Sequence, residues 1–271
     1  MIKLKYVQWD INNISRPTGR KGSRGRRCEI FMTSRTQGAA RPLTELAGKF
    51  GGRFSSELGI KLSGLHADDI FKWLLASVLF GARISQAVAK RTYAEFEKAN
   101  VTSPGAVLRT GWDGLVDILD RGGYARYDFK TATKLLDMSR SLLDEYRGDL
   151  NELHMRSADS LELEARIKAL AKGIGDVTAN IFLREMRGLW RKAEPLPQEL
   201  VLAAARDFGL VPRGLRGGKN VLEMLLQLWQ EEGGSRTDFA DLESALLRAG
   251  LLLRRRKAKS GGAGAEKRQL V

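Results

Sequence analysis

The residues best suited to chemistry lie in a short segment built around two glycines. Gly173 and Gly175 flank one apolar residue, Ile174, and Lys172 comes directly before them. Two glycines permit a tight turn in which the backbone approaches a ligand closely. With a helix on either side, such a turn presents unpaired amide N–H groups and the positive end of a helix dipole. The segment therefore predicts a phosphate-binding turn whose apolar residue, Ile174, is buried in the core.

Basic side chains follow this turn at helical spacing. Arg184, Arg187 and Arg191 recur every three or four residues, so a helix would place them on one face. Arginines on such a face could track the phosphates of a nucleic-acid strand. We therefore predict that the turn and the helix after it bind nucleic acid, with Thr178 as a further contact in the first turn.

Other common chemistries lack the side chains that they need. Cys28 is the sole cysteine, so a disulfide within the chain and a four-cysteine iron–sulfur or zinc site are excluded. The two histidines, His66 and His154, argue against a histidine-rich metal centre and against a Ser/His/Asp triad. We expect no cofactor, with one exception to consider: a Na+ or K+ ion on the turn's carbonyls, at Leu170 and Ile174.

The elements that must position these residues are predicted to be helices almost throughout. Apolar periodicity, proline at helix starts and glycine at helix ends mark about ten helices, whereas strand signals are nearly absent. We expect an all-α protein with two lobes and a groove between them. The expected helices span residues 70–80, 84–99, 104 onward, 112–119, 128–147, 160–170, 176 onward, 197–208, 221–231 and 238–253.

Charge is distributed unevenly along the 271 residues, whose formal net charge is +14. Residues 1–47 carry ten Lys or Arg against three Asp or Glu, and residues 254–271 carry seven against one. The remainder is nearly neutral. We therefore expect a basic, flexible extension over 1–47, a helical domain over 48–253 and a basic, disordered tail over 254–271. The ends either add salt-sensitive affinity for phosphate or serve only as soluble ends.

No secretory hydrophobic segment follows Met1, and no apolar run has the length of a membrane span. We expect a monomer that acts inside the cell, in the cytoplasm or nucleoid, without a membrane partner. The excess of basic residues favours nucleic acid as the polyanionic partner.

The sequence Gly173-Ile-Gly-Asp-Val-Thr-Ala-Asn180 resembles the hairpin of the helix-hairpin-helix (HhH-GPD) DNA glycosylase superfamily. That superfamily includes endonuclease III, 3-methyladenine glycosylase II and 8-oxoguanine glycosylase. Residues 71–85 resemble its buried helix and the turn that line the lesion pocket, and residues 122–126 resemble the turn that wedges into the duplex. The resemblance covers about residues 65–210, with the hairpin at 164–187. It implies a two-lobed, all-α glycosylase without an iron–sulfur cluster, acting on double-stranded DNA with a base lesion or mismatch.

The resemblance also implies contacts around a flipped base. Arg83 stands where relatives place a polar residue that helps to fill the gap left in the duplex. Tyr124 or Arg126 would enter the duplex, and Trp73 or Tyr127 would stack on a base.

One departure from the superfamily concerns the nucleophile. Bifunctional members carry a lysine directly before the hairpin threonine, and this lysine attacks the sugar. Val177 stands at that position and cannot form a Schiff base. The resemblance then implies a monofunctional base-excision enzyme that cuts only the bond between base and sugar. A glycosylase with AP-lyase activity through an unorthodox lysine, Lys172 or Lys192, is an alternative.

A second departure concerns the catalytic carboxylate. The superfamily places an aspartate about twenty residues after the hairpin, where it stabilises the developing oxocarbenium charge or positions water. This chain has no aspartate there. Residues 197–200 resemble the segment with Glu199 at the carboxylate position, and Glu194 is its competitor. Glu199 could instead only favour the start of its helix. If neither carboxylate faces the groove, the protein is a catalytically silent DNA-binding protein.

Overall fold

The computed structural model describes residues 43–266, with side chains to residue 256. Over this range the chain forms helices and no β-strand, which confirms the predicted all-α class; Arg187 and Trp190 make an isolated bridge. The elements in chain order are α1 (Leu43–Phe50), α2 (Phe54–Glu57), the 3-10 helix η1 (Leu62–Gly64), α3 (Ala67–Phe80), α4 (Gln86–Lys98), α5 (Pro104–Gly122), α6 (Asp128–Tyr146), α7 (Leu150–Arg156), α8 (Ser160–Ala169), α9 (Asp176–Met186), α10 (Glu199–Asp207), α11 (Gly218–Glu231) and α12 (Phe239–Glu266).

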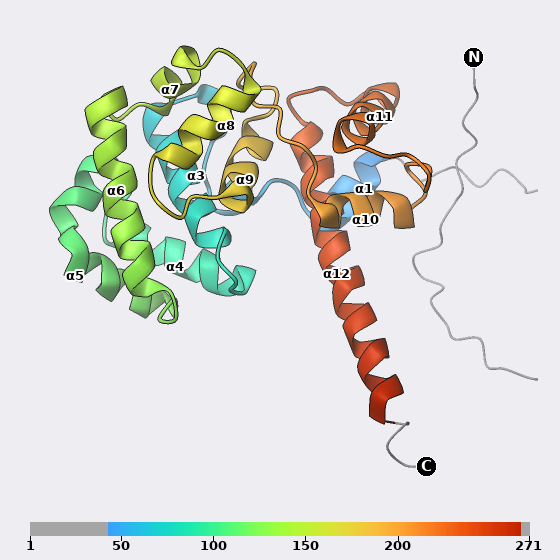
Figure 1. The fold of residues 1–271 in the computed structure, drawn as a ribbon, viewed down its shortest axis with the longest axis horizontal. Coiled ribbons are helices and arrows are strands. Elements are labelled where there is room, and N and C mark those ends of the chain that lie inside the picture. Colours follow the sequence, from blue (N-terminus) through green and yellow to red (C-terminus); the bar gives the residue numbers. More distant parts are fainter. Residues whose placement is uncertain (1–42, 267–271) are drawn as a thin grey trace, which may run out of the picture.

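The first lobe consists of α3 to α9 and has α3 at its centre (Figure 1). From Ile70 to Leu79 every residue of α3 is buried except Lys72, because α4, α6, α7 and α9 pack around it. A helix that is apolar on all sides fits such a position. The long helices α5 and α6 pack on each other at the outer side of this lobe. Two expected helices, one starting at Pro104 and one at 112–119, form α5, and Gly111 (φ +69°) interrupts its helical backbone.

The second lobe unites both ends of the described chain. Helices α1 and α10 pack against α12, and α11 lies beside them (Figure 1). The expected domain start at residue 48 falls inside α1, whose Leu43 and Ala47 are buried. The expected tail from residue 254 begins inside α12, which continues to Glu266 and projects from the lobe. Residues 1–42 and 267–271 of the expected extensions lie outside the described residues.

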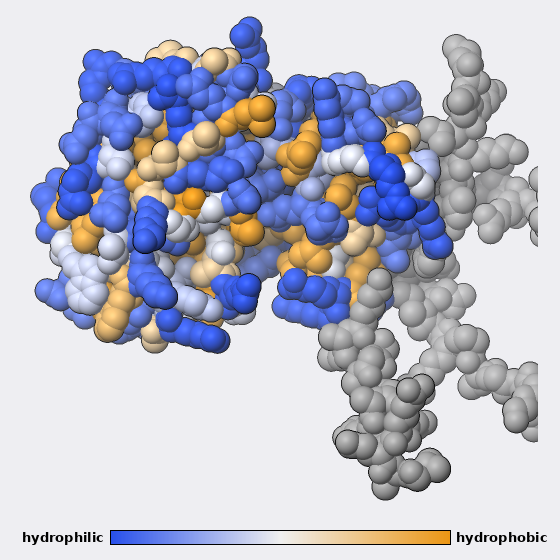
Figure 2. Space-filling model, in the orientation of Figure 1, coloured by the Kyte–Doolittle hydropathy of each residue, from blue (hydrophilic) through white to orange (hydrophobic). Residues whose placement is uncertain are grey.

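Buried polar contacts join the end of α9 in the first lobe to α2 and to α12 of the second lobe. Glu185 of α9 accepts hydrogen bonds from the backbone N–H groups of Phe54 (2.8 Å) and Ser55 (2.9 Å) in α2. Arg187, at the end of α9, lies 3.4 Å from the carboxylate of Glu243 in α12. Figure 2 shows a notch between the lobes on the side from which α12 projects, with hydrophilic residues on both sides. Helix α9 therefore reaches from the interior of the first lobe to its joint with the second.

Candidate nucleic-acid interface

The hairpin before α9 has the geometry that its glycines predict. Gly173 has a φ of +93°, a value that favours glycine, and Ile174 is buried with its N–H donating to the carbonyl of Ala171 at 3.1 Å. Lys172, Gly173 and Gly175 are exposed. Gly175 is the N-cap of α9, and no side chain caps the helix. The amide groups of its first turn are therefore available to an anion, since neither a side chain nor an earlier helical turn pairs them.

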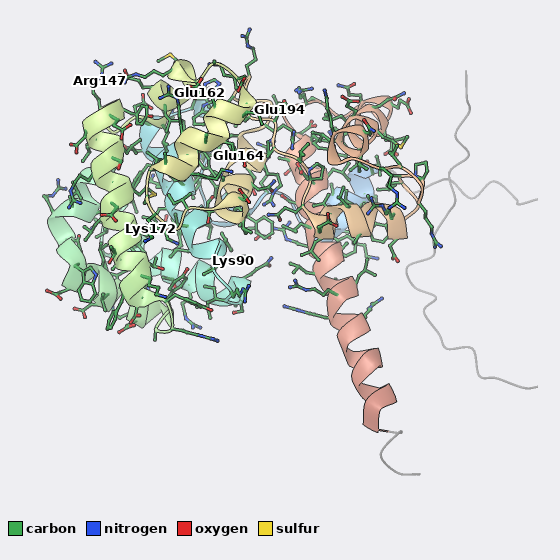
Figure 3. All side chains as sticks on the ribbon, in the orientation of Figure 1. Lys90, Arg147, Glu162, Glu164, Lys172 and Glu194 are labelled. Carbon is green, nitrogen blue, oxygen red and sulfur yellow. The ribbon has the colours of Figure 1, made fainter. Side chains whose placement is uncertain are left out.

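A lysine from another helix lies against this hairpin. A Cβ atom added at Gly173 would lie 3.0 Å from Cε and 3.5 Å from Nζ of Lys134 in α6. Lys134 makes no ion pair with any residue in the described range, and burial lowers the pKa of its ammonium group. Lys172 directly precedes Gly173 and lies beside α6 (Figure 3), so two lysines are next to this glycine. Sequence reasoning missed Lys134, because only the packing of α6 brings it there.

The predicted groove contains a cavity of about 650 Å³ between the lobes. Apolar side chains from both lobes line it, together with three arginines and two glutamines. The lining residues are Phe54, Phe80, Gly81, Ala82, Arg83, Ile84, Gln86, Val177, Ile181, Arg184, Gln198, Leu200, Leu247, Leu251 and Arg254. Its size and apolar walls are typical of a small-molecule or base pocket. Arg83 is exposed at this cavity, where the sequence places it, although its contact with DNA stays a prediction.

Neither candidate carboxylate lines the cavity. Glu194 accepts a hydrogen bond from Arg187 at 3.0 Å and pairs also with Arg236. Figure 3 shows Glu194 where the lobes meet, well apart from Lys172 at the hairpin. Glu199 is exposed as the first residue of α10, directly after Gln198, which does line the cavity. Glu199 is thus one residue from the cavity wall, whereas two arginines already neutralise Glu194.

The predicted arginine face on α9 is wrong for two of its three members. Arg184 is 1% exposed and Arg187 is fully buried, so neither tracks a strand across the surface. The physical reason is that α2 and α12 cover this part of α9: the guanidinium of Arg184 lies over the ring of Phe54, and that of Arg187 over the ring of Phe239. Arg191 is exposed beyond the end of the helix.

Three further predicted contacts are packing residues. Tyr124 is buried and its hydroxyl donates to the Leu79 carbonyl at 3.1 Å, while burial raises its pKa to about 12. Trp73 is buried and donates from its indole N–H to the Phe182 carbonyl at 3.1 Å. Thr178 is buried against α3, where a Cβ atom on Gly81 would lie 2.2 Å from its hydroxyl. None of these side chains is open to DNA.

Arg126 and Tyr127 are the candidates that stay accessible near the predicted wedge. Arg126 is exposed, and its guanidinium lies 5.6 Å from the centre of the half-buried Tyr127 ring. A cation and an aromatic face held together in this way can meet a base or a phosphate.

The alternative nucleophile Lys192 is unavailable for a lyase reaction, because backbone carbonyls already bind its ammonium group. Its ammonium donates to the carbonyls of His154 (2.8 Å), Met155 (3.2 Å) and Ser157, which end α7. Lys172, in contrast, is exposed at the hairpin. Among the lysines proposed for a lyase reaction, only Lys172 has a free ammonium group.

No family model matches this chain, and no curated protein matches it either. Within the described range, no helix combines the length and apolar character that crossing a membrane requires. The same range contains no group of three His, Cys, Asp or Glu side chains that could hold a metal ion. A Na+ or K+ ion on the carbonyls of Leu170 and Ile174 would use other ligands and stays a prediction.

Proposed function

We propose that this chain is a monofunctional base-excision DNA glycosylase with the helix-hairpin-helix (HhH-GPD) fold, active as a monomer on double-stranded DNA. One observation carries the proposal: Val177 belongs both to the hairpin and to the cavity wall. It lies two residues after the N-cap Gly175, is 55% exposed and lines the cavity. A strand anchored at the hairpin would therefore run past the mouth of a cavity of about 650 Å³, which suits a flipped base.

The reaction would be hydrolysis of the bond between the damaged or mispaired base and C1′ of its sugar. Water supplies the hydroxyl at C1′ and the proton taken up by the departing base. Glu199 is the carboxylate that we assign to this step, because it follows Gln198 of the cavity wall and pairs with no basic residue within the described range. Its negative charge would stabilise the oxocarbenium-like transition state or orient the water.

DNA binding at the hairpin is tested by the salt dependence of affinity. Fluorescence anisotropy with a labelled duplex should give a slope of log affinity against log salt that Lys134→Met and Lys172→Met each reduce by about one. Lys219→Met is the matched control for Lys172→Met, because Lys219 is likewise an exposed lysine but belongs to α11 in the second lobe. If the control reduces the slope as much, binding is not centred on the hairpin.

Base excision is tested on duplexes that each carry one damaged or mispaired base, with alkaline cleavage of the abasic product as the readout. Glu199→Gln should slow excision by about 10²–10³-fold while affinity for the duplex is retained. Glu194→Gln should excise normally in protein that remains folded. Normal excision by Glu199→Gln would remove our assignment of the carboxylate. Borohydride trapping on abasic DNA, lost in Lys172→Met, would instead establish the lyase alternative.

A second candidate function has one observation in its favour: no Asp or Glu is among the residues that line the cavity. This arrangement favours a DNA-binding protein that recognises a lesion without cutting. Such a protein would bind a lesion-bearing duplex more tightly than an undamaged one, yet release no base from any member of the panel. The excision assay and the binding assay together separate the two functions.

A further inference from the structure

Arg184 is the charged residue in the cavity wall that is itself almost fully buried. It is 1% exposed, and its guanidinium lies 5.3 Å from the centre of the Phe54 ring. Its Nη2 atom lies 3.6 Å from Oε1 of Glu185, beyond hydrogen-bonding distance. Its Nε and Nη1 atoms have no hydrogen-bond partner among the described residues. Arg184 is thus a buried cation of the cavity wall with two donor atoms that have no partner and are themselves buried.

Glu185 leaves these donors unsatisfied because its carboxylate is already engaged. Both of its oxygens accept backbone N–H groups of α2, from Phe54 and Ser55. Leaving the donors of a buried guanidinium unpaired costs free energy, and an acceptor placed in the cavity would recover it. The unpaired donors of this lining residue therefore point to an occupant that carries acceptor atoms.

The positive charge of the cavity wall also favours an occupant with acceptor atoms. Arg83 and Arg254 also line the cavity, and neither makes an ion pair within the described part of the chain. No acidic residue lines it, and the other polar lining side chains are the neutral Gln86 and Gln198. A positively charged occupant would meet like charge on several sides, whereas a neutral or anionic one would not.

We propose that the cavity selects a base that presents carbonyl or ring-nitrogen acceptors to Arg184, and that it disfavours N-alkylated bases carrying a positive charge. A guanidinium fork can donate to two acceptors on one edge of a base, as arginine does to guanine. This inference rests on the proposed function, because it assumes that the occupant is a flipped base.

The test compares two modified guanines in otherwise identical duplexes, each opposite cytosine. One is 8-oxoguanine, which is neutral and has an added carbonyl, and the other is 7-methylguanine, which is cationic. A fluorine at C2′ of the target nucleotide slows excision, so that equilibrium affinity is measured. An undamaged duplex and one with an abasic analogue complete the set. The wild-type chain should bind the 8-oxoguanine duplex about tenfold more tightly than the 7-methylguanine duplex.

Arg184→Met should abolish this preference and leave affinity for the abasic analogue unchanged, since that duplex places no base in the cavity. Arg191→Met is the control, because Arg191 is exposed beyond the end of the same helix and does not line the cavity. It should keep the preference. Circular dichroism establishes that each variant is folded, and Arg184→Lys, which keeps the charge but loses the fork, should retain only part of the preference.

The outcomes separate the inference from the proposed function. Equal or tighter binding of 7-methylguanine by the wild-type chain overturns the inference without any variant, and so does a preference that survives in Arg184→Met. Equal binding of all four duplexes overturns it too, but leaves DNA binding at the hairpin intact. No binding to any duplex removes the proposed function itself.

Discussion

The two ends of α9 (Asp176–Met186) differ in what their polar groups contact. At the N-terminal end, Gly173, Gly175 and Val177 are exposed, and no side chain caps the first turn. At the C-terminal end, Glu185 and Arg187 are fully buried; Glu185 accepts from backbone N–H groups of α2, and Arg187 pairs with Glu243 of α12. The N-terminal end leaves its backbone N–H groups without a side-chain cap, whereas the C-terminal end uses Glu185 and Arg187 to join the lobes. The cavity lies between them, along the same helix, which contributes Val177, Ile181 and Arg184 to its wall.

This contrast predicts opposite results for charge removal at the two ends. Removing one partner of a buried ion pair leaves the other charge desolvated and unpaired, which is strongly destabilising. Removing an exposed charge beside solvent changes stability little, because water replaces the lost partner. Variants that remove a charge of the joint should therefore unfold more easily, whereas variants that remove a lysine beside the hairpin should fold normally and bind DNA less well.

The largest expected effect belongs to Arg187→Met. It leaves Glu243 buried without its cation and removes the hydrogen bonds to Glu194 and the Pro195 carbonyl. We expect the free energy of unfolding to fall by about 3–5 kcal/mol in urea denaturation. Arg191→Met is the control and should change stability by less than about 0.5 kcal/mol, since Arg191 is exposed. Equal effects of both substitutions would contradict the difference between the two ends.

The same arginines show what could be predicted from sequence. The helices and the hairpin depend on local patterns, such as apolar periodicity, helix starts and glycines, and these were predictable. Spacing also indicates correctly that Arg184 and Arg187 lie on α9, but it does not reveal what covers that helix. The covering groups come from Phe54, far upstream, and Glu243, far downstream, and only tertiary packing brings them there.

The residues of the candidate site also divide into those that local sequence predicts and those that only tertiary packing brings together. Arg83 lies in the turn after α3, within the segment that resembles the superfamily's lesion pocket. A local resemblance was therefore enough to place it at the groove. Lys134 lies on α6 and reaches the hairpin only through packing, so no local signal could identify it. Glu194 was a candidate catalyst by its position in the chain, but Arg187 and Arg236 neutralise it.

A substitution in the body of the first lobe should have an intermediate effect. Gly81→Ala would place a Cβ atom 2.2 Å from the Thr178 hydroxyl and 3.2 Å from the Ser77 carbonyl. We expect a loss of about 1–3 kcal/mol in the free energy of unfolding, because α3 and α9 must shift apart. Adding Thr178→Ala in the same chain should recover part of the loss. Full additivity of the two substitutions would show that they are not in contact.

The two hairpin glycines form a matched pair for a smaller effect. Gly173→Ala strains a backbone with a φ of +93° and crowds Lys134, so we expect a loss of about 1 kcal/mol in stability. At Gly175 an added Cβ atom meets nothing within 4 Å, and the backbone is in an ordinary extended conformation. Gly175→Ala should therefore fold like the wild-type chain yet bind a duplex less tightly, because its methyl group obstructs a phosphate. Unchanged affinity of Gly175→Ala would move the phosphate site away from this glycine.

The smallest expected effect concerns the ion pair at the exposed end of α9. Asp176 lies 2.7 Å from Lys168 of α8, and the hydrogen bond from that ammonium lowers the pKa of the carboxyl group below its ordinary value of 3.8. Because the folded-state pKa is depressed, the pair stabilises the fold above pH 3.8 and loses this contribution as pH falls through the folded-state value. The same pair raises the pKa of Lys168, so its contribution persists through neutral pH.

Differential scanning calorimetry of wild-type and Asp176→Asn protein should show a small difference in melting temperature at pH 7 that shrinks with added salt. The difference should vanish in acid, where Asp176 is protonated and resembles asparagine. A difference that persists in acid would mean that Asp176 acts through something other than its charge. Asp176 is the first residue of α9 and directly follows Gly175 of the hairpin. Its negative charge would repel a phosphate held there, so Asp176→Asn should bind a duplex slightly more tightly at low salt. Stability and affinity would then move in opposite directions at this end of α9, whereas Arg187→Met at the other end changes chiefly stability.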